Sequence, residues 1–203
     1  MLKKMQKQNN SLFLIISLQT QLDNKNKYQT MGFLDFLNGN KSKTITFSTL
    51  PKNIDELKAM PQAGLTDEFE VAALVVAALC RYEESIEDSL EMLNYLMGPT
   101  PMTNIEVQFL RDRLGGKTYK PRSFFAGATP NNGYIPSVPY TIKVSTNPYS
   151  YVDTSAKIFL YSGGADSPRP ICLRKKPSTG QWFVTQFSFL SDIRVPVSED
   201  PWA

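Results

Sequence analysis

The side chains best suited to bind a ligand lie in two loops, of which the first spans residues 115–138. It interleaves cations with aromatic rings, a composition that suits anions or nucleic acid, since cations meet phosphates and rings stack on bases. The same composition fits a structural role in which the rings fix the loop to the core while the cations face solvent. The candidate contact residues in this loop are Tyr119, Lys120, Arg122, Phe124 and Phe125.

The second loop, residues 163–170, has the sequence Gly-Gly-Ala-Asp-Ser-Pro-Arg-Pro. Asp166 can hold a turn by accepting hydrogen bonds from backbone amides, and Arg169 can pair with that carboxylate or with an acidic ligand. The glycine pair lacks the spacing and the following helix of a phosphate-binding loop. We therefore treat Asp166 and Arg169 as candidate contacts, with a structural role as the alternative.

Catalytic chemistry finds little support in this sequence. It contains no histidine, which excludes His-based triads, His-carboxylate metal sites and a histidine pH switch. Cys80 and Cys172 fall in apolar patterns typical of buried thiols, which fits a reducing compartment. Carboxylates crowd one predicted helix, but a solvated helix face rarely gives two of them different environments. We predict no catalytic residue, metal ligand or cofactor. The crowded carboxylates are Glu83, Glu84, Glu87, Asp88 and Glu91.

The net charge of the chain changes sign near Gly115. Residues 31–114 hold 7 Lys and Arg against 13 Asp and Glu, whereas residues 115–203 hold 10 against 5. The formal net charge of +3 comes from residues 1–30, which carry five lysines and one aspartate. The charge of the whole chain therefore makes no case for nucleic-acid binding.

The acidic half predicts about three helices, at 66–80, 85–98 and 103–115. The first starts at a cap on Thr66 and is apolar on every face from Val71 to Cys80, so it must be surrounded by the rest of the protein. The third begins with the capping box Thr103-x-x-Glu106 and stops at a glycine. These helices form a layer, preceded by a short strand at 44–50.

The basic half predicts a four-stranded antiparallel meander, because alternating segments are joined by short turns. We expect an α+β domain with the helices on the apolar face of this sheet and basic side chains on its other face. The predicted strands are Tyr140–Ser145, Ala156–Tyr161, Ile171–Lys176 and Trp182–Phe187. The predicted outward cations are Lys143, Lys157, Arg174 and Lys176.

Residues 44–203 are predicted to form this single domain, with 1–43 as a leader and flexible segment. The apolar stretch 12–16 is too short to span a membrane and lacks a small-residue cleavage site. A translation start at Met31 in a cytoplasmic protein is therefore favoured over secretion.

Several strings resemble an uncharacterised domain family found in Firmicutes bacteria. They are FAGATP at 125–130, GADSPRP at 164–170, DIRVP at 192–196 and DPWA at 200–203. The resemblance covers about residues 45–203 and leaves the leader outside. It implies a bacterial, cytoplasmic protein and supplies no activity to transfer.

Three functions remain open on these observations. The first is a non-enzymatic protein-interaction module that uses both loops, binds another protein or a second copy of itself, and exposes an apolar patch near Tyr119, Phe124 and Phe125. The second is a small-molecule or catalytic pocket enclosed between the sheet and the helices, by analogy with cone-like α+β folds. The third is weak, salt-sensitive nucleic-acid binding through the basic sheet face.

Overall fold

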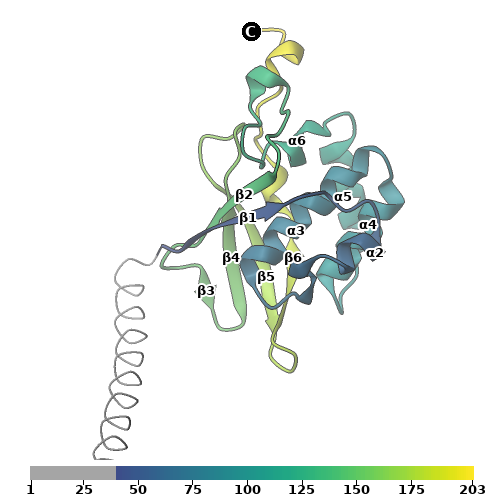
Figure 1. Ribbon diagram of the computed structural model, residues 1–203, viewed down its shortest axis with the longest axis vertical. Helices are drawn as coiled ribbons and strands as arrows, with labels where there is room; N and C mark the ends of the chain where they lie inside the picture. The colour runs from purple at the N-terminus through teal and green to yellow at the C-terminus, as the bar shows by residue number, and fades with distance from the viewer. Residues whose placement is uncertain (1–39) are drawn as a thin grey trace, which may run out of the picture. The chain divides into compact units, whose positions relative to one another are not determined.

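The structure is a computed structural model that describes residues 40–203, of which Lys41–Ala203 form one compact α+β unit (Figure 1). The described part contains five α-helices and six strands, whereas about three helices and a four-stranded sheet, with a separate short strand at 44–50, were predicted. The helices are α2 (Ile54–Lys58), α3 (Glu68–Cys80), α4 (Ile86–Met97), α5 (Asn104–Leu114) and α6 (Tyr119–Arg122). The strands are β1 (Ser42–Phe47), β2 (Tyr140–Ser145), β3 (Tyr151–Val152), β4 (Ser155–Leu160), β5 (Arg169–Lys176) and β6 (Gln181–Gln186). The expectations for the leader and for Met31 lie outside the described residues.

All strand pairs in the sheet are antiparallel, in the order β1-β2-β4-β5-β6, with β3 paired to β4. The prediction of an antiparallel sheet is confirmed, but its extent was wrong. β1 pairs with β2 along its whole length, from Ser42 opposite Ser145 to Phe47 opposite Tyr140. Because these two strands lie far apart in the chain, no local turn signal indicates their pairing.

Helix α3 lies against the inner face of the sheet and is enclosed on its other sides by α4 and α6 (Figure 1). Every residue from Phe69 to Leu79 except Glu70 is buried, as the apolar pattern predicted. The predicted cap was wrong by one residue. Asp67, not Thr66, accepts hydrogen bonds from the amides of Phe69 (2.8 Å) and Glu70 (3.1 Å).

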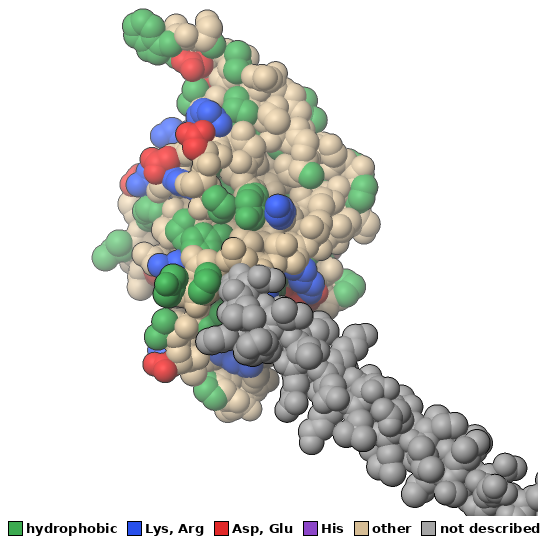
Figure 2. Space-filling view, turned by 90° about the vertical axis from the view of Figure 1, so that its left-hand side faces the viewer, with side chains coloured by type: hydrophobic (Ala, Val, Ile, Leu, Met, Phe, Trp, Pro, Cys, Tyr) green, Lys and Arg blue, Asp and Glu red, His purple; other side chains and the backbone are tan. Residues whose placement is uncertain are grey.

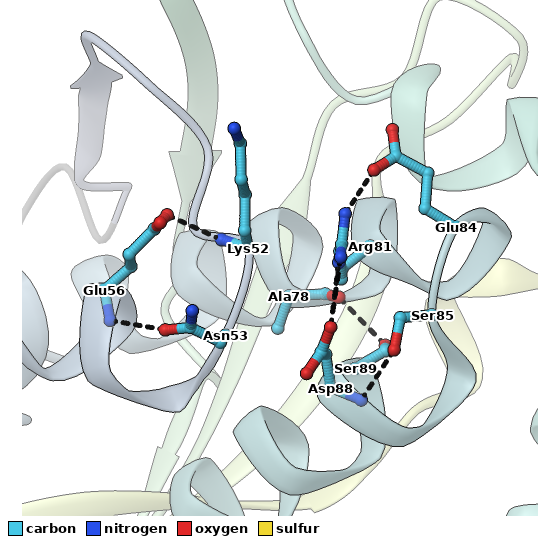
Figure 3. A network of polar contacts seen from close by, with 9 residues as sticks. All are labelled: Lys52, Asn53, Glu56, Ala78, Arg81, Glu84, Ser85, Asp88 and Ser89. Atoms are coloured by element: carbon cyan, nitrogen blue, oxygen red, sulfur yellow. Dashed lines mark hydrogen bonds and ion pairs between the residues drawn. The ribbon is translucent and has the colours of Figure 1, made fainter.

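A polar network fixes the other end of α3 to α4 (Figure 3). Ser89 donates to the carbonyl of Ala78 at 2.9 Å, and Arg81 pairs with Asp88 (3.1 Å) and Glu84. Ser85 caps α4 as predicted, since its hydroxyl accepts from the amide of Asp88. The carbonyl of Ala78, near the C-terminus of α3, thus has a hydrogen-bond donor from α4.

The segment 115–138 is not one continuous loop. It contains α6 and a 3-10 turn at Pro130–Asn132, and Phe125 forms a bridge to Ile142 in β2. The short helix was missed because only four residues are helical, too few for an apolar period to be visible.

Gly98 ends α4 at a point where no side chain fits. Its φ is +66°, and a Cβ atom there would lie 2.2 Å from the ring of Phe183. The loop after α4 therefore packs tightly on β6 only because residue 98 is glycine.

We predict that Gly98→Ala lowers the free energy of unfolding by about 1–3 kcal/mol more than Gly116→Ala does, because overpacking adds to backbone strain. Gly116 is the control for a positive φ alone, with a φ of +64° and open space around its Cβ position, whereas the ψ of −121° at Gly98 adds backbone strain there. Urea unfolding of both variants measures the difference. Equal losses would show that the contact with Phe183 imposes no constraint.

Candidate partner-binding surface

The two loops singled out in the sequence meet in one cluster, which we call the three-loop cluster and define as residues 123–134, 162–170 and 191–194. Gly163 donates its amide to the carbonyl of Ser123 at 2.9 Å, and the hydroxyls of Ser162 and Ser123 are 2.8 Å apart. The amide of Arg194 donates to the carbonyl of Gly164 at 2.9 Å. Three of the family-like strings therefore come together in space.

The three aromatic candidates are core residues. Tyr119, Phe124 and Phe125 are all buried, so the predicted exposed apolar patch near them was wrong. Each packs against another ring, at centroid distances of 5.2–5.5 Å. Their ring partners are Tyr134, Phe189 and Tyr140.

The two cationic candidates of the first loop differ from the expectation that they face solvent freely. Lys120 is only 7% exposed, and burial lowers its pKa, as do the neighbouring charges of Lys117 and Arg113. Arg122 pairs with Glu83 at 3.1 Å. Neither side chain is presented to an incoming partner as an open charge.

The candidates of the second loop pair with the segment 191–194 and not with each other. Arg169 pairs with Asp192 at 2.7 Å and also donates to the carbonyl of Ser191. The Oδ1 atom of Asp166 lies 3.3 Å from Nη1 of Arg194, an ion pair at the surface. These contacts favour the structural alternative for Asp166 and Arg169, because they tie the loop to a neighbouring segment.

Gly164 shows why this cluster is tightly specified. A Cβ atom there would lie 2.1 Å from the hydroxyl of Tyr134, which donates to the carbonyl of Arg194 at 2.7 Å. The glycine lets the buried phenol reach its acceptor.

Open positive charge is found on the outer face of the sheet. Ser145 lies opposite Phe159, and Lys157 lies opposite Cys172. Because opposite residues share a face and side chains alternate along a strand, one face collects cations from three adjacent strands. We call this surface the basic face. Its cations are Lys143, Lys157, Arg174 and Lys176.

No carboxylate neutralises these cations within the described residues. All four are exposed, and β2, β4, β5 and β6 contain no Asp or Glu. Lys143 lies over the ring of Tyr161, 4.5 Å from its centroid. Figure 2 looks onto the side where the sheet lies in Figure 1, and Lys and Arg side chains stand there among hydrophobic ones.

A groove of about 270 Å³ borders the basic face where the loop after α4 meets the β5–β6 hairpin. One side of it is apolar and the other carries three consecutive cations. The residues that line it are Met97, Pro99, Thr100, Arg174, Lys175, Lys176, Pro177, Phe183 and Thr185. No local pattern in the chain indicated this groove, because its two sides come from distant segments.

Two larger grooves, of about 620 and 420 Å³, flank the segment 48–52 at the surface. They are not enclosed between α3 and the sheet, where the pocket hypothesis placed a ligand. Cys80 lines the second groove, but burial raises the pKa of its thiol to about 12. A protonated thiol is a poor nucleophile.

Residues 40–203 contain no group of three or more His, Cys, Asp or Glu side chains placed to hold a metal ion. No helix among them has the length and apolar character needed to cross a bilayer.

The chain belongs to a family described as Domain of unknown function (DUF6935), which matches residues 49–197. The match spans the three-loop cluster and the basic face, while the DPWA string at 200–203 lies beyond it. No curated protein matches the chain. No solved structure matches it either. The comparisons indicate no specific function.

We predict that stability depends on Tyr134 at high pH. Burial raises the pKa of Tyr134 to about 12, whereas a tyrosine in the unfolded chain titrates near pH 10. Between these values the unfolded state loses the proton first, so the free energy of unfolding falls as pH rises from about 10 to 12. Tyr134→Phe should make that fall shallower in denaturant titrations at each pH.

Tyr149→Phe is the control, since Tyr149 is 86% exposed. It should keep the slope of the unaltered protein. Identical slopes for all three proteins would mean that the phenol of Tyr134 does not stay protonated in the cluster.

Proposed function

We propose that this domain is a non-enzymatic protein-interaction module that binds an acidic polypeptide segment on its basic face. One observation carries the proposal: four exposed cations from three adjacent strands share one face and have no carboxylate partner among residues 40–203. Opposite charge across an interface gives specificity and accelerates association.

Ion pairs occur elsewhere in residues 40–203, where five other cations pair with carboxylates, all of them off the basic face. Lys43, for example, pairs with Asp67 (2.7 Å) and Glu70 (2.9 Å) at the start of α3. The ion-paired cations are Lys43, Arg81, Arg122, Arg169 and Arg194.

A polypeptide suits this face better than a nucleic acid does. Residues 40–203 carry 17 Lys and Arg and 17 Asp and Glu, so the domain as a whole has no net attraction for a polyanion. The acidic residues of α4 would repel a long phosphate backbone, whereas a short acidic segment meets the basic face alone. The two free thiols, Cys80 and Cys172, support a reducing, cytoplasmic setting for the interaction.

The test reverses the four charges. A variant with Lys143→Glu, Lys157→Glu, Arg174→Glu and Lys176→Glu should bind a fluorescent Glu-rich peptide at least about 10-fold more weakly than the unaltered chain, as measured by anisotropy. Added salt should weaken the binding of the unaltered chain, because the charges are exposed.

The matched control reverses four cations away from this face, namely Lys52, Lys58, Arg111 and Lys117. Both variants have the same net charge, so a general electrostatic effect would weaken both equally. Equal affinities in the two variants would contradict the proposal. Tighter binding of a single-stranded oligonucleotide than of the peptide would favour the nucleic-acid alternative instead.

A further inference from the structure

Trp202 is the most exposed large hydrophobic side chain in the described residues, at 93% of its surface. It follows Glu199 and Asp200, and Asp200 accepts a hydrogen bond from the amide of Trp202 at 2.9 Å. The indole is thus presented on a turn beside two carboxylates. A tryptophan is among the commonest anchor residues of protein interfaces, since it buries a large area at low entropic cost.

The groove beside the basic face has the complementary character. Met97, Pro99 and Phe183 supply apolar surface, and the run Arg174–Lys176 supplies positive charge. Such a site suits a segment that carries an aromatic side chain beside carboxylates, because the ring can pack on the apolar side while the carboxylates pair with the cations.

The segment and the groove cannot meet within one chain. Figure 1 shows the C-terminal segment at one end of the domain and the β5–β6 hairpin at the other. Contact between them requires two copies.

We propose that the segment Glu199–Trp202 of one copy binds in the groove of a second copy. This inference rests on the proposed function, because it names a partner for the same basic face. The indole packs against Phe183 and Met97, and the two carboxylates lie beside Arg174 and Lys176. The contact joins different surfaces of the two copies, so it leaves a free segment and a free groove and extends head to tail.

The first test measures self-association of the full chain by sedimentation equilibrium over a range of concentrations. The weight-average mass of the unaltered chain should rise with concentration, and Trp202→Ala should weaken association at least about 10-fold. The emission of Trp202 should shift to shorter wavelength as association proceeds. Tyr149→Ala removes another exposed aromatic side chain, outside both surfaces, and should associate like the unaltered chain.

The second test exchanges charges across the contact. Arg174→Glu and Asp200→Arg should each lose association. A mixture of the two variants should regain a dimer, because the unaltered segment of the Arg174→Glu copy meets the unaltered groove of the Asp200→Arg copy. The double variant Arg174→Glu/Asp200→Arg tests the charge exchange itself and should associate, because the introduced acid of one copy then lies beside the introduced base of the next. Lys157→Glu changes a cation of the basic face that does not line the groove, and should leave association intact. No single-chain effect on folding produces recovery on mixing.

The outcomes separate this inference from the proposed function. A chain that stays monomeric at every concentration yet binds the Glu-rich peptide overturns the self-association and leaves the acidic-partner function standing. A chain that does neither overturns both. Association that survives Trp202→Ala and Asp200→Arg also overturns this inference, because another surface must then join the copies.

Discussion

The rest of this structure depends on the need to enclose α3. A helix that is apolar on all sides loses free energy at every face left in water, so it cannot lie on a surface. The sheet covers one side of it, and α4 and α6 cover the others. Its two ends need polar partners, which Asp67 and Ser89 supply. The sheet then has one face occupied by the helix and one face left for other uses.

The charge distribution follows from the same constraint. Charged side chains cannot enter the space between α3 and the sheet, so they collect on the helices and on the outer face of the strands. Acidic residues predominate on the helical side, where Arg81 and Lys43 neutralise some of them. On the basic face no carboxylate of the described part of the chain pairs with the cations. The proposed interaction uses this difference, and the groove adds an apolar anchor at the edge of the same face.

Much of this fold could be predicted from local patterns in the sequence. The β2 boundaries, the Ser85 and Thr103 caps and the enclosure of α3 are confirmed. Long-range pairing was missed, as with β1 in the sheet, because it depends on segments without a shared local signal.

Local patterns also failed to predict the contacts of the candidate residues. Arg169 has the expected kind of partner, but in Asp192 rather than Asp166. The alternation of side chains along the strands predicted the basic face. Only the structure reveals that no carboxylate among residues 40–203 pairs with its four cations. The rings of 115–138 were open to either a contact or a core role, and burial decides for the core.

The most direct test of the account is to locate the bound acidic peptide on the protein. Amide shifts in NMR spectra of the isotope-labelled full chain, followed as a Glu-rich peptide is added, give that location. If the peptide binds on the basic face, the shifts concentrate in β2, β4 and β5, around Lys143, Lys157 and Arg174. Shifts confined to the three-loop cluster, or spread evenly over the domain, would contradict it.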